Sequence, residues 1–438
     1  MAKRTALLLA AAVAVAMLSG CGKKESTENG KIEVEVAIFQ GGYGLDFFEY
    51  AAREYEKMHP DVKIKIWGNP RIWEQLRPRF VAGDPPDLTW PGWGMDTWAL
   101  VYEAKAMEMD KYLETKAYGQ DKRWKDTFVT GALEKGRYNG HYYTLPFTYN
   151  VFGWWYNVNM FEKHGWKPPA TYEELISLCA KIKKTGVAPI TFQGKYPQYM
   201  LQGFLIPWAI SAGGMEAWRD AQNLVPGAWN GPAFLKAAQM VEELGRKGYF
   251  QKGAMGMSHT EAQMEFLLGH AAMIPCGTWL GSEMKKQMPP GFRMQYFNAP
   301  VLKDGKGDPS ITSTGTEPWL IPSEAKHPDI AADFFKFMTS LEMAKKFVLR
   351  KNTLVAVVDS DDVELPPDLV TPARLLREAS DTWSSDYGDW YKQFGDATED
   401  IMAALLNAEV TPKECVDRIE KAAAKVRKDK SIPKHKVD

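Results

Sequence analysis

The sequence lacks an excess of charge of either sign, and no long apolar run occurs after its first residues. Its 438 residues carry 54 Lys and Arg against 55 Asp and Glu, a formal net charge of -1 at pH 7. This balance excludes a polybasic nucleic-acid binder. Hydrophobic and charged fractions of 45% and 25% exclude a disordered chain. No stretch after residue 20 is long and apolar enough to cross a bilayer.

Cysteine is also scarce. Of the 4 cysteines, Cys21 lies near the start, and Cys179, Cys276 and Cys415 are far apart in the rest of the chain. Three such residues allow at most one disulfide, and none of them has the close spacing of a zinc or redox motif. We expect them to be small core residues, and the sequence leaves open whether one pair is oxidised.

Catalytic motifs are missing as well. The chain has no His-Glu-x-x-His, no Gly-x-Ser-x-Gly, no P-loop and no Gly-x-Gly-x-x-Gly. Ser282-Glu283-Met284-Lys285 matches Ser-x-x-Lys, but the motifs that should follow it are misplaced or incomplete, which indicates a chance match. The 7 His residues are scattered. We therefore predict no catalytic residues, no metal and no cofactor, with a glycoside hydrolase using paired carboxylates as an alternative.

The first residues have the features of a secretory signal, which we assign to residues 1–20. Lys3 and Arg4 precede an apolar stretch from Thr5 to Met17. The following Leu18-Ser19-Gly20-Cys21 resembles the bacterial lipobox, which implies that Cys21 becomes lipid-modified after cleavage. Residues 21–30 then form the lipidated Cys and a flexible polar tether. A plain secretory signal is the alternative.

Apolar periodicity predicts an α/β protein. Residues 32–38 and 62–66 alternate as strands around a helix ending at Met58, a β-α-β unit that implies a parallel sheet. Capping-box spacing predicts helices starting after Thr171 and Thr411. One apolar stripe predicts a single helix from Pro328 to Val348.

Several segments together resemble the carbohydrate-binding extracellular solute-binding proteins of ABC importers, the maltose-binding-protein-like family. These segments follow one another in the same order and with similar spacing as in the family, over most of residues 31–350. The segments are His59-Pro60-Asp61-Val62, Ala82-Gly83-Asp84-Pro85-Pro86-Asp87-Leu88, Tyr143-Thr144-Leu145-Pro146, Trp155-Tyr156-Asn157-Val158-Asn159-Met160-Phe161, Gly165 to Leu175, and Gly269-His270-Ala271-Ala272-Met273 with Gly277-Thr278-Trp279. Residues 351–438 resemble the family only loosely.

This resemblance implies a two-lobed periplasmic-binding-protein fold, each lobe a mostly parallel sheet flanked by helices, with the ligand cleft between the lobes. We expect residues 31–147 and 300–350 in the N-terminal lobe and residues 148–299 and 351–438 in the C-terminal lobe. The chain would cross between the lobes near residues 144–147 and 298–301, and again after residue 350. The implied partners are a carbohydrate and an ABC permease, with a monomeric protein touching the membrane through its lipid alone.

Aromatic residues are abundant, with 16 Trp, 18 Tyr and 20 Phe. Flat rings cover the apolar faces of sugars, whereas amides and carboxylates bind the hydroxyls. We expect ligand contacts from residues that follow strands or crossings, or that occupy the family's Gly-x-Trp position: Gln40, Tyr43, Trp90, Trp93, Tyr149, Asn150, Trp208, Trp279, Glu317, Trp319, Trp383 and Tyr387. Nine other tryptophans are expected to pack within the lobes: Trp67, Trp73, Trp98, Trp124, Trp154, Trp155, Trp166, Trp218 and Trp229.

The sequence thus predicts a lipid-anchored sugar receptor of an ABC importer, on the periplasmic or extracellular face of a bacterial membrane. The large number of aromatic residues favours an oligosaccharide or a substituted sugar over a bare monosaccharide. Residues 315–322 resemble the branch that handles N-acetylglucosamine and its short oligomers. The same fold binding a non-sugar solute, such as a polyamine or an anion, is the first alternative, and the glycoside hydrolase is the second.

Overall fold

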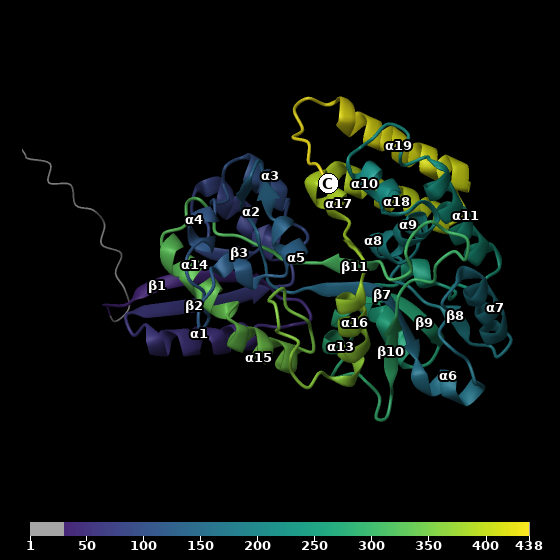
Figure 1. The fold of residues 1–438 in the computed structure, drawn as a ribbon, viewed down its shortest axis with the longest axis horizontal. Helices are drawn as coiled ribbons and strands as arrows, with labels where there is room; N and C mark the ends of the chain where they lie inside the picture. Colours follow the sequence, from purple (N-terminus) through teal and green to yellow (C-terminus); the bar gives the residue numbers. More distant parts are fainter. Residues whose placement is uncertain (1–29, 438) are drawn as a thin grey trace, which may run out of the picture.

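The computed structural model of the chain describes residues 30–437. The predicted signal, Cys21 and all of the tether before Gly30 lie outside the described residues. Two sheets, each flanked by helices, divide the fold into two lobes (Figure 1). We call the part around the smaller sheet the first lobe and the part around the larger sheet the second lobe.

The first lobe is built on a parallel sheet of order β2-β1-β3. Its strands are β1 (Ile32–Phe39), β2 (Val62–Asn69) and β3 (Leu88–Trp90). Ile32 pairs with Val62 and Val36 with Leu88, so the predicted β-α-β unit is confirmed. The helices here are α1 (Asp46–Met58), α2 (Ile72–Ala82), α3 (Thr97–Tyr102), α4 (Asp110–Leu113), α5 (Thr130–Glu134), α14 (Pro328–Met338) and α15 (Leu341–Lys351).

The second lobe contains a sheet of order β13-β11-β7-β9-β8, with β10 also paired to β7. Its strands are β7 (Asn150–Asn157), β8 (Ala188–Ile190), β9 (Ala271–Gly277), β10 (Met294–Phe297), β11 (Thr312–Gly315) and β13 (Thr382–Trp383). Strand β7 runs antiparallel to β9, β10 and β11. This sheet is therefore mixed, whereas the sequence predicts a mostly parallel one, because β7 enters it directly from the crossing between the lobes.

Helices cover this sheet and form the far side of the second lobe. They are α6 (Val158–His164), α7 (Tyr172–Lys183), α8 (Gln198–Met200), α9 (Ile206–Gly213), α10 (Met215–Gln222), α11 (Pro232–Arg246), α12 (His259–Leu267), α13 (Trp279–Glu283), α16 (Pro367–Glu378), α17 (Asp386–Trp390), α18 (Lys392–Leu406) and α19 (Pro412–Lys428). The predicted capping boxes are confirmed: Thr171 with Glu174 begins α7, and Thr411 with Glu414 begins α19.

The single helix predicted over residues 328–348 is wrong, because the chain forms α14 and α15 in its place. The extended backbone of Ser340 interrupts the helix, and its Oγ accepts from the amide of Met343 as the cap of α15. Thr339 Oγ1 accepts from the indole N–H of Trp124 and donates to the carbonyl of Phe335. These two hydroxyls satisfy the backbone and side-chain groups at the break.

Strand pairing shows where the chain passes between the sheets. The short strands β6 (Leu145–Pro146) and β12 (Pro318–Trp319) pair with each other, while β7 starts at Asn150 and β11 ends at Gly315. The first crossing therefore covers residues 147–149 and the second covers 316–317. The second lies later than the predicted 298–301, because residues 312–315 are hydrogen-bonded into the larger sheet. A remaining hairpin joins β4 (Arg137–Tyr138) to β5 (His141–Tyr142).

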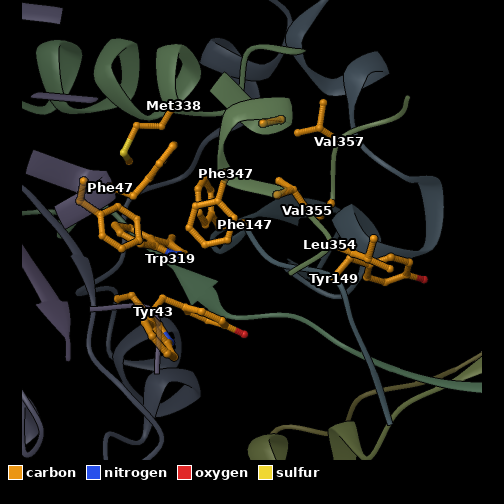
Figure 2. Packing of buried hydrophobic residues seen from close by; sticks show 14 of the residues in the cluster. Tyr43, Phe47, Phe147, Tyr149, Trp319, Met338, Phe347, Leu354, Val355 and Val357 are labelled. Atoms are coloured by element: carbon orange, nitrogen blue, oxygen red, sulfur yellow. The ribbon is translucent and has the colours of Figure 1, made fainter. Parts of the chain in front are cut away.

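The core of the first lobe is unusually aromatic. Phe147 lies 4.9 Å from Phe347 and 5.8 Å from Trp319 between ring centroids, and Phe47 lies 4.8 Å from Phe347 (Figure 2). The nine tryptophans expected to pack within the lobes are all buried or half-buried. Many of the rings therefore pack inside a lobe and have no surface free for a ligand.

The three remaining cysteines lie in the described part of the chain. Cys179, Cys276 and Cys415 are buried free thiols, so they form no disulfide with one another. Burial raises the pKa of each of these three thiols. Within residues 30–437, no helix combines the length and apolarity needed to cross a membrane.

Asp87 joins three elements of the first lobe. Its side chain is 4% exposed, and its Oδ2 accepts from the amide of Glu35 at 2.8 Å, while its Oδ1 accepts from the amide of His327 at 2.7 Å. Glu35 lies in β1, Asp87 precedes β3, and His327 precedes α14. The carboxylate therefore fixes the helix against the sheet.

We expect Asp87→Ala to lower the free energy of unfolding by about 3 kcal/mol, because two amides lose a charged acceptor in a buried site. Urea unfolding measures this change. The matched control is Asp84→Ala, which removes an exposed carboxylate paired with Arg79 and Lys326 and should leave the midpoint almost unchanged. Equal effects of the two substitutions would contradict the role of Asp87.

Candidate functional site

The ends of the strands bring the two sheets face to face. Parallel strands β1 and β3 finish at one edge of the smaller sheet, followed by residues 40–43 and 91–93. In the larger sheet, β9 and β11 end where β7 begins, since Gly277 pairs with Phe152 and Gly315 with Asn150. Strand β8, parallel to β9, ends at the same edge and continues into residues 191–199. Ligands of open α/β sheets bind beyond such carboxyl ends.

Hydrogen bonds connect the two edges. The hydroxyl of Tyr43, after β1, donates to Asn150 Oδ1 at 3.1 Å. The hydroxyl of Thr278, after β9, donates to the same oxygen at 3.3 Å. At Gly42 an added Cβ would lie 3.2 Å from the Cβ of Glu283, so this turn lies directly against α13. We call the region bounded by residues 40–43, 91–93, 191–199 and 278–283 the interlobe edge.

The first lobe has one solvent-exposed aromatic ring at this edge. Trp90 is buried and packs edge-on against Phe39, with ring centroids 4.9 Å apart. Trp93 packs edge-on against Trp90 at 6.0 Å and is 55% exposed. Trp93 is thus supported by an aromatic stack while more than half of its surface stays available. Gln40, which directly follows β1, is also exposed.

The second lobe presents a matching group of rings. Trp279 is half-buried, and its ring lies 5.9 Å from Phe152 and 6.1 Å from Tyr199. Tyr196 follows β8 and is 38% exposed. Among Trp, Tyr and Phe side chains in residues 30–437, only Trp93 and Tyr196 are exposed. The sequence-based list omits Tyr196, which lies six residues after the end of β8, farther from its strand than Gln40 or Trp93.

Polar groups surround these second-lobe rings. One carboxylate oxygen of Glu283 accepts a hydrogen bond from the side-chain amide of Gln263 at 2.8 Å, and the other oxygen lies 3.4 Å from His259 Nε2. The hydrogen bond with Glu283 raises the pKa of His259. The side chain of Gln193 is fully buried, and its Oε1 has no partner in the structure. The interlobe edge therefore combines flat rings with amide and carboxylate groups, the combination that binds hydroxyl-rich ligands.

Glu317 occupies the second crossing. Its side chain is 3% exposed, and its Oε2 has no hydrogen-bond partner in the structure. Burial raises the pKa of Glu317 to about 8, although the neighbouring Thr148 and Trp319 side chains oppose this shift. The carboxyl group is therefore mostly protonated at neutral pH, within a segment that joins the two lobes.

Several residues expected at the ligand are placed in the cores. The Trp208 side chain is fully enclosed, and its indole N–H donates to the carbonyl of Pro300 at 2.9 Å. Trp319 packs among the first-lobe rings, and Tyr387 bonds to Thr398 in the second lobe. Tyr149 is also buried, at 3% exposed. We interpret these four as packing residues and leave them out of the proposed site.

Trp383 is also buried, and it lines a small cavity beside β11 and α9. This cavity has a volume of about 30 Å³, and Gln202, Asn298 and Ser313 also line it. One or two water molecules would fill this space, which is far below the size of a sugar site. The cavity is therefore not the ligand site.

One group of side chains in the described chain has the composition of a cation site. Ligand atoms of Glu108, Asp110 and His141 lie within 4.8 Å of one another. His141 Nδ1 is 2.9 Å from a Glu108 oxygen. The group lies near α4 and β5 on the first lobe and contributes nothing to the interlobe edge.

Comparison with known families decides the class of the protein. Residues 41–345 match the family model of the bacterial extracellular solute-binding proteins.

The chain belongs to this family.

Its relatives include the diacetylchitobiose-binding protein NgcE of Streptomyces coelicolor, 29% identical over 411 residues that cover 92% of this chain and 87% of that protein. The multiple sugar-binding protein of Streptococcus mutans is 24% identical, with 92% and 93% covered.

Solved structures agree on the fold. A chitin oligosaccharide binding protein superimposes with a TM-score of 0.74 at 20% identity, covering 90% of this chain and 98% of that one. The two-lobed α/β class predicted from the sequence is confirmed. The family is one of extracellular solute-binding proteins, and both relatives are named as binding proteins.

The buried carboxyl of Glu317 yields a prediction about pH. Its pKa in the folded protein, about 8, lies above the ordinary value of 4.5, so the folded state keeps a proton that the unfolded state loses. Stability therefore falls as the pH rises from about 4.5 to about 8. Glu317→Gln, which cannot ionise, should escape this loss and exceed the wild type by more than about 1 kcal/mol at pH 8.

Urea unfolding at a series of pH values measures this difference. The matched control is Glu324→Gln, which changes an exposed carboxyl on the same lobe and should give a pH profile parallel to the wild type. A difference between Glu317→Gln and the wild type that stays constant from pH 4 to pH 9 would contradict the burial argument.

Proposed function

We propose that this solute-binding protein is a lipid-anchored receptor that captures a sugar between its lobes and delivers it to the membrane permease of an ABC importer. The observation that carries the proposal is the position of the exposed rings. Trp93 and Tyr196 lie on opposite lobes, each in the loop that follows a strand, at edges joined by the hydrogen bond from Tyr43 to Asn150.

Sugar chemistry suits this arrangement. A pyranose has an apolar patch of C–H groups on each face, which a flat ring covers, and hydroxyls around its rim, which need polar partners. Trp93 and Tyr196 supply accessible ring surface, and Gln40 and Glu283 supply polar groups beside them. An affinity near 1 μM needs about -8 kcal/mol, which a few rings and several hydrogen bonds provide after ordering costs.

The relatives indicate the kind of sugar. NgcE binds diacetylchitobiose, and the similar solved structure is a chitin oligosaccharide binding protein. We therefore propose an oligosaccharide carrying N-acetyl groups as the first ligand to test. The charged side chains at the edge are paired, His259 with Glu283 and Lys195 with Glu261, so the site carries no strong excess charge and suits a neutral ligand.

Binding would favour closure of the lobes. A ligand that touches rings of both lobes binds the closed arrangement more tightly than an open one, and it shifts the population accordingly. The crossings at residues 147–149 and 316–317 would then act as hinges. The permease would receive the closed form.

Thermal unfolding against a sugar panel tests the proposal. A ligand at a hundred times its Kd adds about 2.7 kcal/mol of stability, which raises the melting temperature visibly. We expect N-acetylated oligosaccharides to give the largest rise. The proposal fails if no mono- or oligosaccharide raises the melting temperature. A polyamine or anion that raises it would favour a non-sugar solute, and release of reducing ends would favour a hydrolase.

Removing a ring at the edge should weaken binding without unfolding the protein. We expect Trp93→Ala and Tyr196→Ala each to raise the Kd at least tenfold, equivalent to about 1.4 kcal/mol, as measured by calorimetry.

Trp279→Ala should abolish the sugar-induced rise in melting temperature while the unliganded melting temperature changes by only a few degrees. The matched control is Trp166→Ala, which removes a half-buried ring stacked on His164 outside the edge. Equal losses of affinity in all four variants would contradict the assignment.

The anchor has its own test. We expect the full chain, expressed in a bacterium, to incorporate labelled palmitate and to fractionate with membranes. Cys21→Ser should lose both properties while the released protein keeps its sugar affinity, because the substitution changes no residue of the interlobe edge. A Cys21→Ser protein that stays on the membrane and incorporates label would contradict the lipobox interpretation.

A further inference from the structure

The chain continues beyond α19 as residues 429–437, which we call the tail segment. In Figure 1 this yellow segment leaves α19 and returns toward the boundary between the lobes, ending near α17 and α3. Helix α17 belongs to the second lobe and α3 to the first, and the two helices lie in contact. The tail segment therefore reaches a place where both lobes are within range.

His435 of the tail segment lies among aromatic rings of both lobes. Its ring stacks on Trp390 with centroids 4.6 Å apart and an angle of 2° between the planes. On the opposite lobe, Trp98 packs edge-on at 4.7 Å and Tyr138 lies at 5.3 Å. A hydrogen bond of 2.5 Å joins His435 Nε2 to the hydroxyl of Tyr102. One side chain thus contacts α17 of the second lobe and α3 and β4 of the first.

The backbone of the tail segment is hydrogen-bonded to the second lobe at His435 and Val437. The amide of Val437 donates to Asn223 Oδ1 at 2.8 Å, and Asn223 Nδ2 donates to the carbonyl of Val437 at 2.8 Å. The amide of His435 donates to the hydroxyl of Tyr391 at 2.9 Å. Asn223 is the residue at the end of α10, and Tyr391 directly follows α17, so both anchor points lie on the second lobe. From there the imidazole of His435 reaches the first lobe.

The imidazole acts here as a neutral flat ring. Burial lowers the pKa of His435 to about 4, so the side chain is uncharged at neutral pH and stacks without the cost of burying a charge. If the lobes moved apart at α3, the ring would lose either its contacts with Trp98, Tyr102 and Tyr138 or its stacking on Trp390. Any such movement therefore has to break this group of contacts.

We propose that the tail segment is an interlobe strap, in which His435, held on the second lobe, binds the aromatic pocket of α3 and β4 and restrains separation of the lobes. The contact lies outside the interlobe edge and uses none of its rings. It would lower the population of wide-open forms, and so raise the affinity for any ligand that binds the closed form. The restraint itself does not depend on the ligand, so it is separable from the proposed sugar-binding function.

The test measures the distance between the lobes without any sugar. Spin labels at Val81→Cys on the first lobe and Leu268→Cys on the second use side chains that are 81% and 54% exposed. The full chain carries Cys21→Ser, and Cys179, Cys276 and Cys415 are buried, so the labels go to the two chosen positions. Pulsed electron resonance then gives the distribution of distances between them.

We expect a narrow distribution in the parent protein. His435→Ala and deletion of residues 430–438 should broaden it and shift it to longer distances. His435→Phe, which keeps a flat ring but loses the bond to Tyr102, should stay nearer to the parent. The matched control is Lys430→Ala, an exposed residue of the same segment, which should reproduce the parent distribution.

Sugar affinity supplies a second readout where a sugar has been found to bind. We expect His435→Ala to raise the Kd at least threefold while Lys430→Ala leaves it unchanged. Parent-like distance distributions in both His435→Ala and the deletion would overturn the strap, whatever the sugar result. A shifted distribution in a protein that binds no sugar would support the strap and count against the proposed function alone.

Discussion

The oxygen of one amide, Asn150 Oδ1, holds the two lobes in register. It lies at the first residue of β7, directly after a crossing, and accepts from Tyr43 of the first lobe and Thr278 of the second. Because β7 runs antiparallel to β9 and β11, its start lies at the edge where those strands end. The loops that follow β1, β3, β8 and β9 therefore face one region, and the exposed rings of this bacterial extracellular solute-binding protein lie there.

The division of the aromatic residues follows from the same geometry. Rings on the sheets and helices fill the lobes, as Trp319 and Phe347 do, and Phe147 of the first crossing packs against both (Figure 2). Of the rings in the loops beyond the strands, Trp93 and Tyr196 are exposed, whereas Tyr43 is buried. Trp93 is more than half exposed, although Trp90 just before it is buried. A large tryptophan content is therefore compatible with a receptor in which few rings reach the ligand.

The sequence predicts the elements with strong local signals. Alternation in β1 and β2 and the capping boxes of α7 and α19 are read correctly, because neighbouring residues determine them. The break at Ser340 escapes prediction, since the apolar stripe continues across it and the hydroxyls that stabilise it bond to distant partners such as Trp124. The second crossing is misplaced because β11 (Thr-Ser-Thr-Gly) has no apolar alternation. Burial of Trp208 and exposure of Tyr196 depend on tertiary packing, which spacing does not reveal.

The central claim is that a sugar bridges the rings of the two lobes at the interlobe edge. A crystal structure with the oligosaccharide that most raises the melting temperature tests it most directly. The account predicts sugar density in contact with Trp93 of the first lobe and with Trp279 or Tyr196 of the second. Density elsewhere, for example in the cavity lined by Trp383 or on the surface of one lobe, would contradict it.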